Sequence, residues 1–324
     1  MWCDLFPGRR VTLLLHMNGV DEAGWADRLG PLLGDRPVYR RDDHFDPASI
    51  DYILAWKPGP DAFAGLSNLK AILSYGAGVD SLLDHRGLPD GVPIIRFSDP
   101  DLTGRMRDYV VAEVLAHHRL ETRFRAQQRR REWTQIAPPR AEDINVGVMG
   151  LGVLGKAALA ALAGFGYDLV GWSRSSNIVP GVRAFWGAEG LVPFLEKTDI
   201  LVCLLPLTRE TRGILNAKTF SALRRGWLPG GPVVINAARG ALQVEADLAV
   251  ALRDGTLGAA SVDVFETEPL ALDSPLWGLH NCRITPHVAA VSDPAAGAIY
   301  FAGVIRDFEA GWSMPHLVDR ARGY

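Results

Sequence analysis

The chain has 324 residues, a formal net charge of −3 and 48% hydrophobic residues. This length suits two domains of about 150 residues each, and the composition is that of an ordinary globular protein. The small negative charge argues against nucleic acid or an anionic membrane as a partner. Because no apolar run approaches the length of a membrane span, we expect no membrane association.

The three cysteines, Cys3, Cys203 and Cys282, are widely separated. They show neither the spacing of metal ligands nor a paired framework of disulfides. We therefore expect no metal site and a reducing, cytoplasmic location. Cys203 and Cys282 lie in apolar segments, which predicts core positions for both.

The first hundred residues alternate short apolar segments with turns that contain proline and glycine. This pattern predicts a helix at 21–33 and strands at 11–16, 52–55, 71–74 and 93–97. Such alternation is typical of a small α/β domain with a parallel sheet.

Residues 102–131 have helical periodicity and are predicted to form one long helix. Adjacent helix positions point in different directions, so His117 and His118 are expected at the surface or in a subunit interface. A nucleic-acid patch and a solvated or subunit-facing helix end are both possible for the arginines near the end of the helix. The slightly acidic chain favours the second interpretation for Arg123, Arg125, Arg129, Arg130 and Arg131.

Residues 145–156 read Asn-Val-Gly-Val-Met-Gly-Leu-Gly-Val-Leu-Gly-Lys. They predict a strand and a glycine turn, followed by a small-residue helix at 157–165 and a second strand at 168–172. Gly150, Gly152 and Gly155 have the spacing of a dinucleotide-binding turn. They permit the tight turn, the approach of a pyrophosphate to the backbone and close packing of the helix, respectively.

Strands and helices continue to alternate after this unit. Strands are predicted at 200–204, 233–236, 259–263 and 282–285. Helices are predicted at 218–223 and 245–254, and a last helix at 293–310 could return the chain to the first domain.

Four further stretches occur in a characteristic order: Gly76-Ala77-Gly78-Val79-Asp80, Asn-Ala-Ala-Arg-Gly at 236–240, Asp-Val-Phe-Glu-Thr-Glu-Pro-Leu at 263–270 and Thr-Pro-His-Val-Ala-Ala at 285–290. With these stretches the chain resembles the D-isomer-specific 2-hydroxyacid dehydrogenases over essentially its whole length. Within that family it most resembles the glyoxylate/hydroxypyruvate reductase A group. The shared features are Trp172-Ser173-Arg174-Ser175, Met106 and the ending Ala-Arg-Gly-Tyr at 321–324.

The resemblance implies an α/β protein with two domains. An NAD(P)-binding Rossmann domain, residues 101–288, would be inserted in a flavodoxin-like substrate domain formed by 1–100 and 289–324. Family analogy also implies a homodimer formed through the helix that starts at Leu102.

Reduction of a 2-oxoacid requires a cation, an acid and a group that keeps the acid charged. Arg239 suits the first role, because its permanently charged planar group can bind carboxylate and carbonyl oxygens together. His287 suits the second, because imidazole acts as acid or base near neutral pH. Glu268 suits the third, since a carboxylate bonded to the imidazole favours its charged form and orients it. The matching residues have these roles in the family.

The resemblance also implies a set of cofactor-binding residues. Asp263 would hold the nicotinamide carboxamide, and Leu205, Pro206 and Thr211 would line the adenosine side. The full set is Gly150, Gly152, Val153, Leu154, Gly155, Trp172, Ser173, Arg174, Ser175, Leu205, Pro206, Thr211, Ala237, Ala238, Arg239, Asp263 and His287.

The end of the second strand indicates which nicotinamide cofactor is used. NAD-specific sites usually place Asp or Glu there, whereas this chain has Trp172-Ser173-Arg174-Ser175. No carboxylate in this segment repels a 2′-phosphate, and Arg174 with its flanking serines can bind one. We therefore predict that NADPH is preferred and that NADH use is possible.

Substrate contacts are predicted in the first domain. The resemblance implies that Tyr75, Gly76, Ala77 and Gly78 lie at the substrate, with the N–H groups of Ala77 and Gly78 holding its carboxylate. Arg239 and His287 would complete the contacts. Trp56 and Trp277 could form walls of the pocket or could be ordinary packed aromatic residues.

The sequence thus predicts hydride transfer from NADPH to a small 2-oxoacid while His287 protonates the oxygen. Glyoxylate would yield glycolate, and hydroxypyruvate would yield D-glycerate. Two alternatives stay open: a dehydrogenase for larger 2-oxoacids such as phenylpyruvate, and a non-catalytic NAD(P)-sensing interaction protein.

Overall fold

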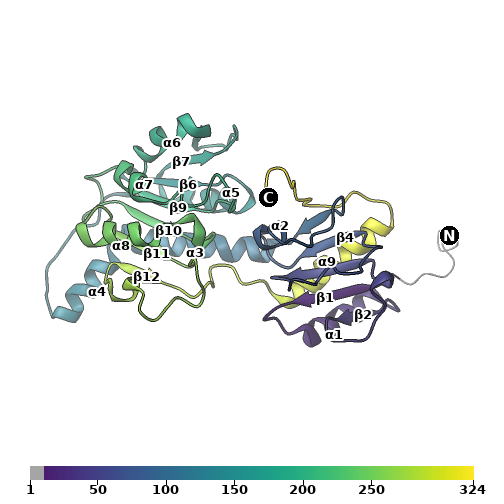
Figure 1. Cartoon of the computed structure of the whole chain (residues 1–324). Helices are drawn as coiled ribbons and strands as arrows, with labels where there is room; N and C mark the ends of the chain where they lie inside the picture. Colours follow the sequence, from purple (N-terminus) through teal and green to yellow (C-terminus); the bar gives the residue numbers. More distant parts are fainter. Residues whose placement is uncertain (1–10) are drawn as a thin grey trace. The chain divides into compact units, whose positions relative to one another are not determined.

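A computed structural model describes residues 11–324 of the chain, which divide into two compact units (Figure 1). Of the described residues, 11–101 and Ser292–Tyr324 form the first unit, and Leu102–Val291 form the second. Each unit is built around its own parallel sheet. Cys3 lies outside the described residues.

The first unit contains a 5-stranded sheet in the order β2-β1-β3-β4-β5, in which every neighbouring pair is parallel. This order is that of the flavodoxin-like fold. The strands are β1 (Leu13–Met17), β2 (Val38–Arg40), β3 (Tyr52–Trp56), β4 (Ala71–Ser74) and β5 (Ile94–Arg96).

Helices α1 (Glu22–Leu33), α2 (Asp80–Leu83) and α9 (Pro294–Glu309) and the 3-10 turn η1 (Pro47–Ser49) belong to the first unit. Helix α1 begins after Asp21, whose side chain accepts a hydrogen bond from the Gly24 N–H. Trp25 of α1 lies 6.3 Å from Phe301 of α9, measured between ring centroids. This contact ties the C-terminal helix to the first unit.

The second unit contains a 7-stranded parallel sheet in the order β12-β11-β10-β9-β6-β7-β8. Strand order reverses at β6, and ligands of such sheets bind at the carboxyl ends of the strands beside this switch point. The strands are β6 (Asn145–Met149), β7 (Asp168–Ser173), β8 (Arg183–Trp186), β9 (Ile200–Cys203), β10 (Val233–Asn236), β11 (Ala259–Val262) and β12 (Cys282–Ile284).

The helices of the second unit cover both faces of its sheet, so that every residue of β6, β9, β10 and β11 is buried. These helices are α3 (Pro100–His118), α4 (Glu121–Arg130), α5 (Val153–Leu162), α6 (Gly187–Leu195), α7 (Ala217–Ala222) and α8 (Glu245–Asp254). Four 3-10 turns accompany them: η2 (Ala141–Asp143), η3 (Ala163–Phe165), η4 (Gly240–Leu242) and η5 (Pro275–Gly278).

The prediction of one helix over 102–131 is wrong. Helix α3 ends at His118, Leu120 takes a left-handed backbone conformation (φ 60°, ψ 31°), and α4 begins at Glu121. The Leu120 side chain is buried, and this packing offsets the roughly 1 kcal/mol or more that such a conformation costs. The chain therefore changes direction before the arginine-rich segment.

The expectation that His117 and His118 lie at the surface or in a subunit interface is also wrong, because other parts of the same chain cover α3 on more than one side. His117 and His118 are both buried. The Nε2 atom of His117 lies 2.8 Å from the Ser261 hydroxyl. The Nδ1 atom of His118 lies 2.8 Å from the Tyr167 hydroxyl, and its Nε2 atom lies 2.8 Å from the Pro139 carbonyl oxygen.

Three polar residues one turn apart on α3, of which the first is partly buried and the other two are buried, form a row against β11 and the residue after β12. The hydroxyl of Tyr109 lies 3.0 Å from that of Thr285. Glu113 accepts a 2.6 Å hydrogen bond from Ser261, which also contacts His117. Burial raises the pKa of the Glu113 carboxyl group, although the Ser261 hydroxyl and Arg283 act in the opposite direction.

None of the helices in residues 11–324 has the length and hydropathy needed to cross a membrane. The same residues hold no cluster of three or more His, Cys, Asp or Glu side chains suited to a metal ion. Cys203 is buried, Cys282 is partly buried, and both are free thiols.

Candidate active site

The glycine turn after β6 has the geometry that a dinucleotide requires. Gly150 has φ 105°, and its N–H donates to the Trp172 carbonyl oxygen at 2.8 Å. A Cβ atom at Gly155 would lie 1.9 Å from the Gly150 carbonyl oxygen, so only glycine lets α5 pack this closely. A Cβ atom at Gly152 would meet nothing within 4 Å, and no side chain caps this helix end. The open, amide-rich start of α5 fits a pyrophosphate.

Other residues predicted at the cofactor lie beside this turn. Val153 and Leu154 form the first turn of α5, and Val153 is exposed. After β9, which neighbours β6 in the sheet, Leu205 is buried. Thr211 donates a 2.7 Å hydrogen bond to the Pro206 carbonyl oxygen and thereby closes the loop that carries Leu205.

At the carboxyl end of β7, Arg174 is exposed whereas Trp172 is buried. The Trp172 side chain is buried, and its indole N–H donates to the Gly187 carbonyl oxygen at 2.9 Å. The Ser173 hydroxyl donates to the Ser175 carbonyl oxygen at 2.8 Å and shapes the turn. Arg174 is exposed, so its guanidinium group is accessible to an anionic ligand.

The carboxylate of Glu210, which the sequence analysis did not consider, lies within electrostatic range of Arg174. The hydrogen bond from Thr208 is the main cause that lowers the pKa of the exposed Glu210, and Arg174 and Arg209 lower it further. Glu210 is far from Arg174 in the sequence, so only the fold brings their charges together.

The residues predicted for the reacting centre follow three neighbouring strands. Arg239 follows β10, Asp263 follows β11, and His287 lies three residues beyond β12. Since these strands are adjacent and parallel, their carboxyl ends share one edge of the sheet. The same edge carries the glycine turn that follows β6.

Asp263 holds the turn that carries His287. Its carboxylate is 1% exposed and accepts hydrogen bonds from the Thr285 hydroxyl (2.6 Å) and from the N–H groups of Val288 (2.9 Å) and Ala289 (3.0 Å). The His287 N–H donates to the Asp263 carbonyl oxygen at 2.8 Å. These bonds maintain the left-handed backbone of His287 (φ 55°), a strained state for a residue other than glycine.

The His287 imidazole is paired with the Glu268 carboxylate. Its Nδ1 atom lies 2.9 Å from Oε2 and 3.0 Å from Oε1. Because a carboxylate only accepts hydrogen bonds, Nδ1 carries a proton, and Nε2 is the nitrogen that can exchange one with a ligand. Glu268 Oε1 also accepts from the Phe265 N–H at 3.1 Å, which orients the carboxylate.

Arg239 follows the buried residues Ala237 and Ala238, and its Nη1 atom donates to the Ala238 carbonyl oxygen at 2.7 Å. Asn236 braces this segment by accepting from the Ala238 N–H and donating to the Arg239 carbonyl oxygen, both at 3.1 Å. It also donates to Gln243 at 3.1 Å. Asn236 and Gln243 are positioning residues that the sequence reasoning missed, because their side-chain contacts depend on the folded loop.

The substrate residues predicted in the first unit are packed together at the carboxyl ends of β3 and β4. The rings of Trp56 and Tyr75 meet edge to face, with centroids 5.6 Å apart. A Cβ atom at Gly76 would lie 2.3 Å from the Trp56 ring, so glycine is needed for the indole to lie against this backbone. Ala77 and Gly78 continue the same loop.

Trp277, the other tryptophan considered for a wall of the pocket, lies in η5 of the second unit. It is half-exposed, and its indole N–H donates to the Ala271 carbonyl oxygen at 2.9 Å.

A family profile described as "D-isomer specific 2-hydroxyacid dehydrogenase, NAD binding domain" matches residues 111–289. The chain belongs to this family. It is 39% identical over 284 residues to glyoxylate/hydroxypyruvate reductase A of Yersinia enterocolitica, which covers 86% of this chain and 89% of the relative.

Two solved structures extend the similarity to the whole fold. The NADPH-dependent glyoxylate/hydroxypyruvate reductase of Sinorhizobium meliloti, in complex with NADP and sulfate, has a TM-score of 0.90 and 41% identity, covering 97% of this chain and 100% of that one. A probable 2-hydroxyacid dehydrogenase of Rhizobium etli, in complex with NADP, HEPES and L(+)-tartaric acid, has a TM-score of 0.91 and 45% identity, covering 98% and 100%.

These similarities confirm the predicted family, the two-domain α/β fold class and the enzyme class. The chain is an oxidoreductase of the kind that acts on CH–OH donors.

Proposed function

We propose that this protein reduces small 2-oxoacids with NADPH, glyoxylate to glycolate and hydroxypyruvate to D-glycerate. The observation that carries the proposal is the His287–Glu268 pair, which lies at the sheet edge that also carries Arg239. The names of the reductase relatives support the choice of substrates.

Arg239, His287 and Glu268 have separate roles in the proposed reaction. When bound, NADPH supplies the hydride. Arg239 binds the substrate carboxylate and polarises the ketone, because its guanidinium group can donate to both. His287 donates the proton on Nε2 to the substrate oxygen as negative charge develops there. Glu268 keeps the imidazole oriented and stabilises its positive charge.

NADPH is the cofactor that the second unit fits. The glycine turn at Gly150–Gly155 suits the pyrophosphate, and the exposed Arg174 suits the 2′-phosphate. The Sinorhizobium and Rhizobium relatives were solved with NADP. In this proposal Asp263 contributes to nicotinamide binding mainly by holding the turn around His287.

The first unit is proposed to supply further substrate contacts. The N–H groups of Ala77 and Gly78 would bind the carboxylate, and the Trp56 ring would limit the size of the substrate side chain. We also propose a homodimer formed through α3 and a cytoplasmic location. Light scattering at micromolar protein concentration tests the dimer, and a monomeric mass would contradict it.

A steady-state panel tests the proposed reaction. The kcat/KM values for glyoxylate, hydroxypyruvate, pyruvate, 2-oxobutyrate and phenylpyruvate are measured with NADPH and with NADH. We expect the highest values for glyoxylate and hydroxypyruvate. A preference for phenylpyruvate would favour the alternative of larger substrates, and tight NADPH binding without any turnover would favour a sensing protein.

A further inference from the structure

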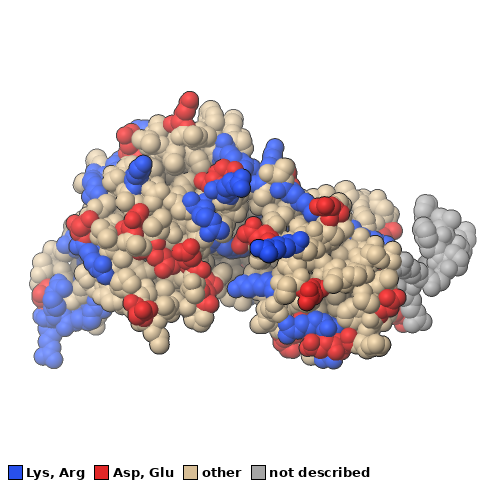
Figure 2. Space-filling model, in the orientation of Figure 1, with Lys and Arg blue, Asp and Glu red and all other residues tan. Residues whose placement is uncertain are grey.

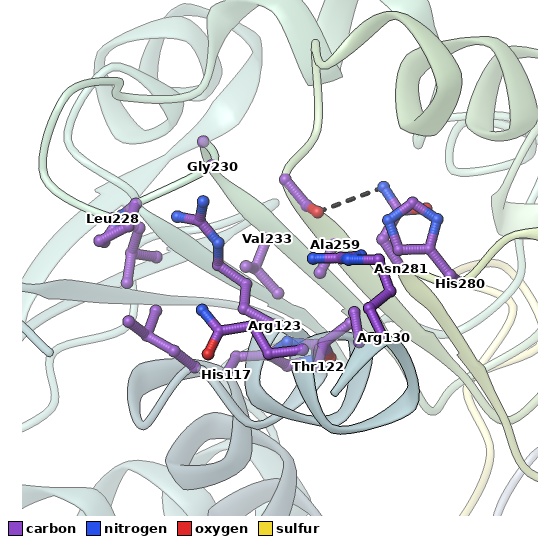
Figure 3. Close-up of a pocket in the computed structure, with 16 residues that line it drawn as sticks. His117, Thr122, Arg123, Arg130, Leu228, Gly230, Val233, Ala259, His280 and Asn281 are labelled. Atoms are coloured by element: carbon purple, nitrogen blue, oxygen red, sulfur yellow. Dashed lines mark hydrogen bonds between the residues drawn. The ribbon is translucent and has the colours of Figure 1, made fainter. Parts of the chain in front are cut away.

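The cavity shown in Figure 3 is separate from the candidate active site. It has a volume of about 300 Å³ and is lined by segments that precede β10, β11 and β12, whereas the reacting residues follow these strands. Arg130, one of the two arginines that Figure 3 labels, is already paired with both carboxylate oxygens of Glu132, each at 2.8 Å. The first unit, by contrast, contains two histidines at the loop that follows Trp56, and the proposed reaction does not use them.

These two histidines hold the same residue. His16 belongs to β1, and His85 follows α2. The Gly59 N–H donates to Nε2 of His16 at 3.1 Å, and Nε2 of His85 lies 2.8 Å from the Gly59 carbonyl oxygen. Gly59 stands between two prolines, which have no N–H, so its amide is the only backbone donor in residues 58–60. The two imidazoles thus bond both polar backbone groups of Gly59.

The bonds fix where each ring carries its proton. Nε2 of His16 accepts, so this ring is neutral and has its proton on Nδ1. Nδ1 of His85 accepts from the Gly87 N–H at 3.0 Å, so its proton is on Nε2, which donates to Gly59. The His85 ring also packs edge to face on Phe63, with centroids 5.0 Å apart. A second proton on His16 would replace the acceptor by a donor and leave two N–H groups facing each other.

Residues at the end of β1 also hold the start of this loop. The Asn18 N–H donates to the Trp56 carbonyl oxygen at 3.0 Å, and its side-chain amide donates to the Lys57 carbonyl oxygen at 2.6 Å. Lys57 has a left-handed backbone (φ 44°), a strained state for a residue other than glycine. Its ammonium group lies 5.8 Å from the centroid of the Trp56 ring. The bonds from Asn18 and the histidines therefore maintain the backbone that directly follows Trp56.

The surroundings of His16 keep its ring neutral at physiological pH. Burial is the main cause that lowers the pKa of the imidazole. Arg41 and His85 lower it further, whereas Glu22 of α1 and Asp42 raise it. On the face drawn in Figure 2, acidic and basic side chains are likewise mixed over the first unit. The bond from Gly59 is therefore complete at neutral pH and is lost as the pH falls through the lowered pKa.

We infer that His16 and His85 are positioning residues for substrate binding, which hold residues 57–60 so that the Trp56 ring keeps its place. The inference rests on the proposed function, because it takes Trp56 as a wall of the substrate pocket. A Cβ atom at Gly76 would lie 2.3 Å from the indole, so the ring is in close contact with the loop predicted to bind the substrate carboxylate. A shift of residues 57–60 moves the ring relative to that loop.

The pH profile of KM tests the inference on the full chain with saturating NADPH. Between about pH 7.5 and about pH 5, protonation of His16 should raise KM for glyoxylate about fivefold, as expected for one lost hydrogen bond, with no matching fall in kcat. His16→Gln should remove this rise, because its side-chain oxygen accepts a hydrogen bond and does not titrate. Protonation of His287 has the opposite effect on KM, since a cation favours the anionic substrate, and it is common to both proteins.

Further variants separate the pair from a general loss of structure. His16→Ala and His85→Ala should each raise KM about fivefold at both pH values, while kcat and the dissociation constant for NADPH change little. His44→Gln is the matched control, because His44 is an exposed histidine of the first unit that takes no part in these bonds. Its KM profile should follow that of the wild type. A parallel fall in kcat and NADPH binding in the two alanine variants would contradict the positioning role.

Hydrogen–deuterium exchange provides a measurement that needs no turnover. In peptides that span residues 58–60, Gly59 contributes the only amide of that segment. After correction for the intrinsic rate, its protection in the wild type should fall about fivefold between about pH 7.5 and about pH 5, and His16→Gln should abolish the fall. Protection that is independent of pH in the wild type, or identical KM profiles for the wild type and His16→Gln, would overturn the inference.

Failure of the proposed function would give a different result. Absence of turnover with every 2-oxoacid of the panel would remove the role of the two histidines in substrate binding, while pH-dependent protection of Gly59 would still establish their bonds. Normal turnover together with pH-independent protection of Gly59 would refute the histidine pair alone.

Discussion

The Glu268 carboxylate lies 2.9 Å from Nδ1 of His287 and also accepts the Phe265 N–H, so the imidazole has a charged partner that is itself fixed. Replacing Glu268 by Gln keeps a hydrogen-bond acceptor and removes the charge. We expect kcat for 2-oxoacid reduction to fall about 10- to 100-fold, since stabilisation of the imidazolium is lost. Steady-state kinetics measures this loss.

His287→Ala removes the proton donor itself. We expect kcat to fall by about 10² to 10⁴, while the dissociation constant for NADPH, measured by fluorescence titration, stays nearly unchanged. Loss of NADPH binding in this variant would indicate that His287 is structural.

Asp263→Asn tests the turn that carries His287. One carboxylate oxygen becomes an NH2 group that cannot accept the hydrogen bonds made to it. We expect a loss of about 2 kcal/mol in the free energy of unfolding and a Tm lower by roughly 4–8 °C, with a fall in kcat as well. Thermal unfolding measures the first effect. Thr285→Val removes one of these bonds together with the Tyr109–Thr285 contact but keeps those from Val288 and Ala289. It should therefore lower kcat less than Asp263→Asn does, and an equal or larger fall in kcat would argue against this role of Asp263.

Arg174→Ala tests cofactor selectivity. Hydrogen bonds between charged groups contribute about 1.5–3 kcal/mol, so kcat/KM for NADPH should fall roughly 10- to 100-fold. The value for NADH should change little, because NADH has no 2′-phosphate. An equal loss with both cofactors would mean that Arg174 only supports the loop.

Glu210→Gln is the companion variant, because this exposed carboxylate lies within electrostatic range of Arg174. Removing its charge should lower KM for NADPH about two- to threefold, a small effect because solvent screens exposed charges. Added salt should reduce the difference from the wild type.

His117 predicts how stability depends on pH. Its pKa is about 4 in the folded protein, lowered chiefly by burial, against about 6.5 when unfolded. Between these two pKa values the unfolded state binds more protons than the folded state. The contribution of His117 to the free energy of unfolding is therefore complete above about pH 6.5 and is lost as the pH falls toward 4. The difference between these two pKa values corresponds to about 3 kcal/mol. In urea unfolding, His117→Gln should show a shallower decline between pH 7 and 4, and an unchanged decline would exclude His117 as the cause.

Local patterns were sufficient to predict much of the fold. The strand at 233–236 and the helix at 245–254 agree with β10 and α8, because their apolar periodicity is set within the segment itself. The glycine spacing predicted the turn after β6 for the same reason. Strands β2 and β8 were missed, since both are short edge strands with few buried residues. Pro193 inside α6 concealed that helix.

The missed features depend on contacts between distant parts of the chain. The left-handed Leu120 follows from its tertiary packing, which no periodicity reveals. The bonds of the Asp263 carboxylate to a turn more than twenty residues away were missed as well, and its contact with the cofactor stays a prediction. The reacting residues themselves were proposed from family resemblance, and their roles stay predictions until the variants are measured.

The row of Tyr109, Glu113 and His117 has a consequence for how the second unit assembles. Sliding α3 by one turn along the sheet would separate Tyr109 from Thr285 and Glu113 from Arg283, so that buried or partly buried polar groups would lose their present partners. A helix that carries such a row has one docking position, and the alternatives are rejected by unpaired polar groups rather than by shape. The row therefore fixes the position of α3 along the sheet, and with it the position at which the helix ends before Leu120.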